Sequence, residues 1–202
     1  MINYFHNSII ECYYNFILEK EKKMLSMIEY VHQRIKAYPS GLIGVDMTMG
    51  NGCDTVFLAE HCQEVYAFDI QEQALLKTQE KVKDLSNVHL ILDNHENIDL
   101  YFHSFDIGIF NLGYLPGLNH QTTTVLSSTK VAIKKAIKMM NEVLFIVVYV
   151  GHEEGQKESV WIDHYVSHLD THLYNVSCYS MLNKKNAPYV IEIQKRKSQK
   201  RF

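Results

Sequence analysis

The stretch Val45-Asp46-Met47-Thr48-Met49-Gly50-Asn51-Gly52-Cys53-Asp54-Thr55 decides the fold of this chain. An apolar run at 42–45 leads into it and a helix-like segment follows, so the pattern predicts a strand, a tight glycine turn and a helix. Gly50 and Gly52 let the backbone turn sharply and let a ligand approach closely. The helix N-terminus beyond them offers unpaired backbone N–H groups.

The turn does not match two common nucleotide motifs. The dinucleotide fingerprint G-x-G-x-x-G would need glycine where Thr55 stands, and the GK[ST] of a phosphate loop is missing. Asp46 would repel a pyrophosphate and suits a ligand with a cationic amino group, while Asp69, after the apolar run 65–68, can hold two ribose hydroxyls. An acid at each of two strand ends flanking G-x-G resembles the S-adenosylmethionine site of class I methyltransferases. The alternative is an ordinary strand–turn–helix in which Asp46 is a cap.

Composition limits the classes of protein that this chain can be. Its 202 residues, 47% of them hydrophobic, suffice for one domain with a substantial core. A net charge of -3 gives no global basic field for nucleic acid, although a local patch can suffice. The four cysteines form no C-x-x-C, which indicates free thiols in a reducing compartment and no metal site. No apolar run reaches the roughly 18 residues of a membrane span, and the N-terminus lacks a signal-peptide pattern, so we expect a cytoplasmic protein without a membrane part.

Hydrophobic periodicity predicts the order of the elements. Residues 1–37 contain no glycine or proline and show apolar residues at helical spacing, which predicts an N-terminal helical extension before a catalytic domain at 38–202. Residues 1–23 should form a helix outside the catalytic sheet, as a dimer contact or a cap on the substrate side. The expected strands are 42–46, 64–69, 88–92, 106–110 and 143–150; the expected helices are 53–61, 71–84, 122–140 and 155–169, with a short helix or loop at 95–103.

This alternation predicts an α/β fold with a doubly wound, mostly parallel sheet covered on both faces. Two final strand-like runs, 174–182 and 189–194, are separated by too few residues for a crossover helix, so they should pair as an antiparallel hairpin and bring the sheet to seven strands. In helix 155–169 we expect one face to carry Val160, Trp161, Tyr165, Val166 and Leu169.

A second group of polar and permissive residues follows strand 106–110, in Asn111-Leu112-Gly113-Tyr114-Leu115-Pro116-Gly117. The carboxyl end of such a strand faces the ligand crevice. Asn111 offers one acceptor and two N–H donors there. The loop resembles the Asn-Pro-Pro-Tyr loop of amino-group methyltransferases, with Leu-Gly in place of Pro-Pro. The alternative is a turn with a capping asparagine and a core tyrosine.

Together these stretches resemble one family, the rRNA methylase family of class I S-adenosylmethionine-dependent methyltransferases, which includes the wobble-uridine methyltransferase of tRNA in Gram-positive bacteria. The matching pieces are Asp46-x-Thr-x-Gly50-Asn51-Gly52-x-Asp54-Thr55, Ala67-Phe68-Asp69-Ile70-Gln71, Asn111 to Gly117, the threonines at 122–124, Tyr149-x-Gly151-His152-x-x-Gly155 and Asn186-x-Pro188. The chain departs from the family pattern at Met47, Met49, Cys53 and Val150, and its first twenty or so residues are additional.

The resemblance implies methyl transfer from S-adenosylmethionine to the primary amine of 5-aminomethyl-2-thiouridine at the tRNA wobble position, giving 5-methylaminomethyl-2-thiouridine. The anticodon stem-loop of tRNA is then the expected partner. Cofactor contacts are implied for Asp46, Thr48, Gly50, Asn51, Gly52, Asp54, Thr55, Asp69, Ile70, Gln71, Asp93, Asn94, His95 and Asn111. Catalytic roles are implied for Asn111, Tyr114 and His152, the last two as proton acceptors. Substrate contacts are implied for Leu112, Gly113, Tyr114, Thr123, Tyr149, His152, Lys184 and Lys185.

Three groups of basic residues are candidates for phosphate contact, although a solvated face is the default for each. They are Lys184 and Lys185 in the hairpin turn; Lys130, Lys134, Lys135 and Lys138 on helix 122–140; and the tail residues Lys195, Arg196, Lys197, Lys200 and Arg201.

Other functions remain open at this stage. An rRNA or small-molecule amine methyltransferase fits the same fold, and the modest charge favours a small substrate. The asparagine loop opposes that reading. A non-catalytic S-adenosylmethionine-binding or nicotinamide-binding module is a third reading, which the joint presence of Asp46, Asp69 and Asn111 opposes.

Overall fold

The computed structural model describes residues 24–112, 126–151 and 153–197. The helix expected within residues 1–23 lies outside this range. The described helices are α2 (Met27–Ile35), α3 (Cys53–His61), α4 (Glu72–Val82), the 3-10 helix η1 (His95–Leu100), α5 (Leu126–Met139) and α6 (Glu153–Ser167). The strands are β1 (Ile43–Asp46), β2 (Glu64–Asp69), β3 (Val88–Leu92), β4 (Phe105–Asn111), β5 (Met140–Val148), β6 (Tyr174–Tyr179) and β7 (Tyr189–Lys195).

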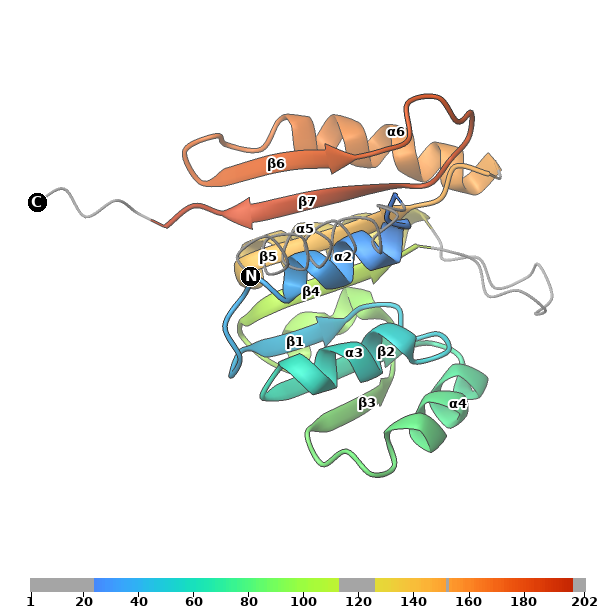
Figure 1. The fold of residues 1–202 in the computed structure, drawn as a ribbon, viewed down its shortest axis with the longest axis vertical. Helices are drawn as coiled ribbons and strands as arrows, with labels where there is room; N and C mark the ends of the chain where they lie inside the picture. Colours follow the sequence, from blue (N-terminus) through green and yellow to red (C-terminus); the bar gives the residue numbers. More distant parts are fainter. Residues whose placement is uncertain (1–23, 113–125, 152, 198–202) are drawn as a thin grey trace, which may run out of the picture.

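The strands form one seven-stranded sheet in the order β3-β2-β1-β4-β5-β7-β6 (Figure 1). The strands β3, β2, β1, β4 and β5 are parallel, whereas β7 is antiparallel to both β5 and β6. The predicted fold class is therefore confirmed, including the terminal hairpin. The chain moves outward from β1 to β3 and then returns to β4, so the strand order reverses between β1 and β4. Ligands of doubly wound sheets bind at the carboxyl ends of the strands beside such a reversal.

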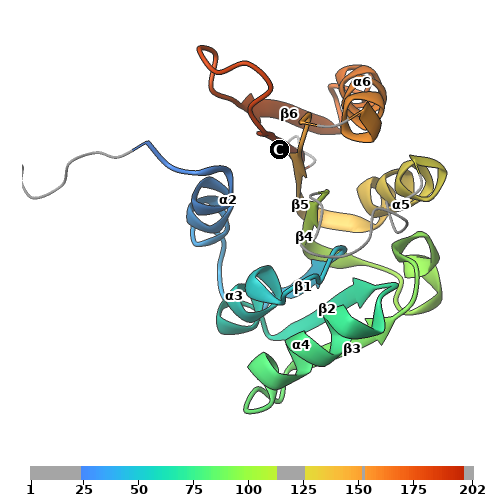
Figure 2. The same cartoon turned by 90° about the vertical axis from the view of Figure 1, so that its right-hand side faces the viewer.

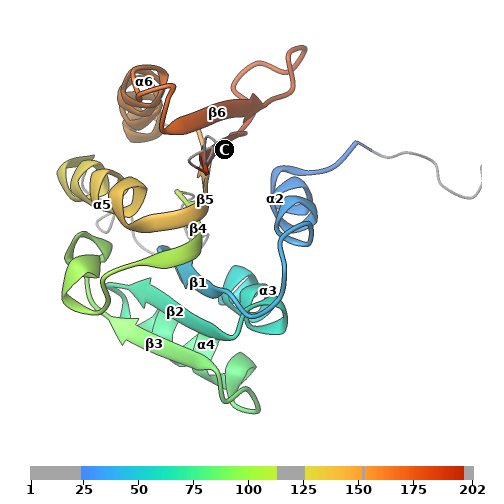
Figure 3. The ribbon, with the colours of Figure 1, turned by 90° about the vertical axis from the view of Figure 1, so that its left-hand side faces the viewer.

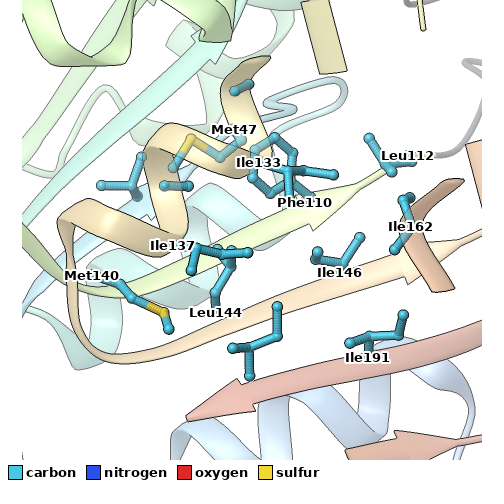
Figure 4. Packing of buried hydrophobic residues seen from close by; sticks show 14 of the residues in the cluster. Met47, Phe110, Leu112, Ile133, Ile137, Met140, Leu144, Ile146, Ile162 and Ile191 are labelled. Atoms are coloured by element: carbon cyan, nitrogen blue, oxygen red, sulfur yellow. The ribbon is translucent and has the colours of Figure 1, made fainter. Parts of the chain in front are cut away.

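Helices cover both faces of the sheet. Figures 2 and 3 show α2, α3 and α4 on one face, and α5 and α6 on the other. The central strands alternate their buried side chains between the two sides, as the two-residue period of a strand requires. In β5, Leu144 and Ile146 pack toward α5 and α6, together with Phe110, Ile133 and Ile162 (Figure 4). The alternate residues Val143, Phe145 and Val147 pack toward α2 and α3.

The sequence located most elements to within a few residues, with one error of helix orientation. Helix α3 and strands β2 and β3 have the predicted bounds, whereas β5 begins at Met140 and shortens the preceding helix. In α6 the expected face is partly wrong, because the side chain of Val160 is 71% exposed while Ile162 is fully buried. Leu169 lies beyond the helix end but packs against the core with Trp161, Tyr165 and Val166. The true inner stripe runs through Ile162 and Val166, four residues apart.

Helix α2 packs into the core beside α3 and does not stand apart from the sheet. It begins with a capping box in which Ser26 and Glu29 bond reciprocally. Met27, Val31 and Ile35 are buried, at the three- and four-residue spacing of a helix face, against β5 and β7. The predicted division at residue 37 stays a prediction, but the described part of the N-terminal segment shares the core of the domain.

A polar contact also anchors α2. Arg34 donates from Nε and Nη2 to the carboxylate of Glu192 in β7, over 2.9 and 2.7 Å. Glu192 is only 3% exposed and also accepts hydrogen bonds from Tyr30 and Gln194. A buried carboxylate is costly without a charged partner. Arg34 therefore offsets the cost of burying the charge of Glu192 beneath α2.

Arg34→Ala should lower the free energy of unfolding by about 1–3 kcal/mol, since it leaves Glu192 buried without its cation. Chemical denaturation of the full chain measures this difference. Gln33→Ala, on the exposed side of the same helix, serves as the control and should change stability little. Equal stability of the two variants would show that the ion pair contributes nothing net.

Candidate active site

The glycine turn between β1 and α3 has the backbone conformation that its sequence predicts. Gly50 and Gly52 have φ values of 52° and 75°, in the left-handed region that favours glycine. Gly52 also lies against α4, because a Cβ there would stand 2.6 Å from the Oγ1 atom of Thr78. Gly52 is the N-cap residue of α3, and no side chain caps the amides of the first helical turn. Asn51 at the tip of the turn is exposed.

Asp46 at the end of β1 is fully buried and stabilises the turn from inside. Its Oδ1 accepts from the Thr48 N–H over 3.0 Å, and its Oδ2 accepts from the Thr55 hydroxyl over 2.7 Å. Burial raises the pKa of Asp46 to about 7, and the nearby charge of Asp54 adds to the rise. The side chain is thus not the freely ionised group that the sequence suggested, and it contacts Thr55 inside α3 without capping that helix. Its predicted cofactor contact stays a prediction.

Asp69 at the end of β2 is partly exposed and bonded to the turn. Its Oδ2 accepts from the Gly50 N–H over 3.0 Å and its Oδ1 from the Gln71 N–H over 2.9 Å. Each carboxylate oxygen retains a further lone pair for a ligand hydroxyl. Ile70 follows with half of its side chain exposed, which leaves an apolar surface beside the carboxylate.

The segment after β3 places a histidine acceptor beside the turn. Asp93 accepts from Tyr101, Asn97 and Asn94, and these bonds lower its pKa. Asn94 caps η1 by accepting from the Glu96 N–H. The Nδ1 atom of His95 lies 3.0 Å from the carbonyl oxygen of Met47, which can only accept, so Nδ1 carries the proton. Burial lowers the pKa of His95, and its buried Nε2 is left as an acceptor with no partner among the residues that the structure describes.

Asn111 ends β4 and is the centre of a hydrogen-bonded chain. Its backbone N–H donates to the Thr48 hydroxyl over 2.7 Å, and its Nδ2 donates to Asp54 Oδ2 over 3.1 Å. The other carboxylate oxygen of Asp54 lies 2.7 Å from Nε2 of His32 in α2. Among the described residues, the buried Oδ1 atom of Asn111 has no hydrogen-bond partner. An unpartnered buried acceptor is costly unless a ligand supplies a donor.

Four further predicted residues share this edge of the sheet. Tyr149 directly follows β5, where burial and then the charge of Asp54 raise its pKa. Lys184 and Lys185 are exposed in the turn between β6 and β7, and Tyr189 after that turn pairs with Val148 at the carboxyl end of β5. Leu112 is buried next to Asn111. Gly113, Tyr114 and Thr123, and the side chain of His152, lie outside the described residues.

The other basic candidates are placed less favourably. Lys195, Arg196 and Lys197 lie at the opposite edge, where they bond to Met140, Thr171 and Glu142. Lys135 pairs with Asp99, and Lys130 and Lys134 lie over the Trp161 ring. Lys138 is exposed toward the far end of α5. Lys200 and Arg201 are outside the described range.

Sequence reasoning did not single out His32. The residue belongs to α2, and its partner Asp54 lies in the first turn of α3. The spacing of Val31 and Ile35 predicts the helix, but it does not predict which neighbouring element the polar face of that helix contacts. One feature of the sequence could have indicated this contact. His32 lies next to Val31 of the buried helix face, in a helix that precedes the glycine turn.

Comparison with known proteins decides the family. The family model "Putative rRNA methylase" matches residues 65–195. The chain belongs to this family. A crystal structure of a "putative methyltransferase" from Streptococcus mutans, in complex with SAH, is 39% identical and superposes with a TM-score of 0.80, covering 86% of this chain and 99% of the other. A "putative rRNA-methylase" from Clostridium thermocellum is 31% identical, with a TM-score of 0.82 and coverage of 86% and 100%.

A curated relative gives a more specific likeness. The chloroplastic tRNA (mnm5s2U34)-methyltransferase of Arabidopsis thaliana is 28% identical over 173 residues, which are 76% of this chain and 63% of that protein. The chain therefore spans less than two thirds of the length of this relative. The predicted class, an S-adenosylmethionine-dependent methyltransferase of the rRNA methylase family, is confirmed by these matches.

Two features are absent from the part of the chain that the structure describes. None of the described helices is long and apolar enough to cross a membrane. Among the same residues, no three His, Cys, Asp or Glu side chains are grouped so that they could hold a metal ion.

The raised pKa of Asp46 makes stability depend on pH. The folded protein holds this proton more tightly than the unfolded chain, whose aspartate has its ordinary value of 3.8. The stabilisation is full below that value and is lost as the pH rises through about 7. From about pH 5 to about pH 7.5, wild type should lose about 2 kcal/mol more unfolding free energy than Asp46→Asn.

Denaturant titrations of the cofactor-free protein at several pH values measure this difference. Asp84→Asn, at an exposed position, is the control and should follow wild type. Parallel pH profiles for wild type and Asp46→Asn would contradict the prediction.

Proposed function

We propose that this protein transfers a methyl group from S-adenosylmethionine to the primary amine of 5-aminomethyl-2-thiouridine at the wobble position of tRNA. The observation that carries the proposal is the buried, unpartnered Oδ1 of Asn111 at the strand reversal. A group that only accepts hydrogen bonds suits a substrate nitrogen that carries N–H donors. The likeness to the curated tRNA methyltransferase supports the choice of substrate.

The groups available in the crevice fit the chemistry of the cofactor. Its ribose hydroxyls and its amino groups are donors, and the chain offers acceptors at Asp69 and at the Nε2 atom of His95. Gly50 and Gly52 hold the turn in a left-handed conformation, in which its backbone could lie close to the cofactor. We assign the ribose to Asp69, the adenine to Ile70 and the Asp93–His95 segment, and the methionine part to the glycine turn.

The chemistry requires positioning more than proton transfer. When bound, S-adenosylmethionine supplies a methyl group on a sulfonium; attack by the amine lone pair breaks the S–C bond and leaves a secondary ammonium. The amine must first be neutral, because an ammonium has no lone pair. Asn111 would accept a hydrogen bond from one N–H of the amine and so orient the amine lone pair toward the methyl group. Tyr114 and His152 remain the proposed proton acceptors.

The tRNA would approach the edge of the sheet that carries Asn111. Among the described basic residues, Lys184 and Lys185 combine this edge with an exposed position. They would contact phosphates of the anticodon stem-loop and add a salt-dependent term to the affinity. A homodimer and a cytoplasmic location stay predictions.

Asp69→Ala should weaken S-adenosylmethionine binding by at least about tenfold, because a charged acceptor for ribose hydroxyls is lost. Titration calorimetry with the full chain gives the dissociation constant. Glu72→Ala, at an exposed position in the first turn of α4, is the control and should bind like wild type. Binding of NAD in place of S-adenosylmethionine by the wild type would overturn the cofactor assignment.

Asn111→Ala should reduce methyl transfer by a hundredfold or more, corresponding to the about 2.7–4 kcal/mol lost with one positioning hydrogen bond in other enzymes. Cofactor affinity should change little. The assay follows labelled methyl from S-adenosylmethionine into tRNA that carries 5-aminomethyl-2-thiouridine. Asn141→Ala is a matched control, since that amide also donates to an aspartate but at the opposite edge of the sheet.

Transfer RNA without the aminomethyl group is the substrate control and should accept no methyl. Nucleoside mass spectrometry of tRNA and rRNA from a deletion strain then identifies the natural target. Loss of a methyl group from rRNA, with tRNA unchanged, would refute the tRNA assignment. Near-normal turnover of Asn111→Ala would show that other residues hold the amine.

A further inference from the structure

We propose that His32 and Asp54 form a positioning pair that sets the orientation of the Asn111 side-chain amide, so that its oxygen and not its NH2 group meets the substrate. This inference rests on the proposed function for the identity of the substrate amine. The pair itself is visible in contacts that do not depend on any substrate. It extends the active-site machinery to α2, a helix that carries no residue of the predicted site.

The side-chain amide of Asn111 could take either of two orientations, which exchange its oxygen and its NH2 group. The two orientations have nearly the same shape, and only the hydrogen-bond partners distinguish them. A carboxylate without a proton accepts but does not donate. Because Oδ2 of Asp54 lies 3.1 Å from the Asn111 amide, the NH2 group must point toward Asp54. The amide oxygen is then directed away from Asp54, and it is the atom that lacks a partner.

His32 holds the carboxylate of Asp54. Asp54 is 7% exposed, and its second oxygen, Oδ1, lies 2.7 Å from Nε2 of His32. A carboxylate oxygen requires a donor, so Nε2 of His32 carries a proton. The His32 ring stacks flat on Phe57, with centroids 3.7 Å apart and an interplanar angle of 3°. The ring plane is thus fixed by packing while its N–H fixes the carboxylate.

Two other ionisable groups lie close to Asp54. Burial, and then the charge of Asp54, raise the pKa values of both Asp46 and Tyr149. Among these neighbours, His32 supplies a hydrogen-bond donor to Asp54 beside a second buried carboxyl. The positioning role requires Asp54 to accept from Asn111, since a protonated carboxyl could donate to Asn111 and reverse the amide.

Asp54→Asn tests this chain of dependence without changing side-chain size. His32 would bond the new amide oxygen, which turns the new NH2 group toward Asn111 and favours the reversed Asn111 amide. The turnover number should fall by about tenfold or more, as expected for a misplaced reacting group, with the KM for tRNA changed by less than about threefold.

Two substitutions of His32 separate hydrogen bonding from packing. His32→Phe keeps an aromatic ring for the stack on Phe57 but has no donor, whereas His32→Gln keeps an N–H donor and loses the stack. A positioning role predicts lower turnover for His32→Phe and partial recovery for His32→Gln. A purely structural role predicts the reverse order, in both turnover and thermal stability. His89→Gln is the matched control, because His89 forms a similar pair with Glu64, over 2.6 Å, in the exposed outer strands.

The decisive readout needs no substrate. In NMR spectra of the labelled full chain, the Asn111 side-chain amide should show one proton shifted downfield by its bond to the carboxylate. The shift should disappear in Asp54→Asn and weaken in His32→Phe. If the wild type fails to methylate amine-bearing tRNA but the amide signals behave as stated, the substrate is wrong and the positioning pair stands. An unchanged Asn111 signal and turnover within about twofold of wild type in Asp54→Asn would overturn the pair.

Discussion

The pairing of β1 with β4 is the constraint on which the site depends. The two strands are neighbours only because the chain returns to the centre of the sheet after β3. Their ladder continues beyond the last residue of β1, through a bond from the Met47 N–H to the Ile109 carbonyl and another from the Asn111 N–H to the Thr48 hydroxyl. These bonds bring the glycine turn to the end of β4. The glycine turn proposed to bind the cofactor and the asparagine proposed to hold the amine are therefore parts of one hydrogen-bonded unit.

That unit gathers three aspartates, and each carboxyl group is stabilised differently. Asp46 is buried and takes up a proton more readily than an exposed carboxyl. Asp69 accepts two backbone N–H groups at the exposed rim. Asp54 has His32 on one oxygen and Asn111 on the other. Since like charges at close range oppose each other, a different partner for each group is what lets all three remain at one strand edge.

The fold could be predicted well from the sequence because the patterns that indicate strands and helices lie within short segments of the chain. Apolar runs such as 42–45 and 65–68 show where strands lie, and the residue after each run must lie at the carboxyl edge. This reasoning placed Asp46, Asp69 and Asn111 at one edge before any contact was known. Contacts between elements far apart in the chain carry no such pattern, so the pair of His32 with Asp54 was missed. Val160 was misplaced for a related reason, because an apolar residue on an exposed face adds to a helical pattern without packing against anything.

Helix α2 shows how a segment before the catalytic motifs can still determine the geometry at the site. From one short helix, His32 reaches α3 and Arg34 reaches Glu192 in β7, while Val31 and Ile35 are buried against the sheet between them. Two residues apart on a helix lie about 200° apart around its axis, so these polar side chains leave on opposite sides of the buried stripe. A displacement of the helix that preserved one contact would break the other. The bond to Glu192 therefore also limits where His32 can place the carboxylate of Asp54.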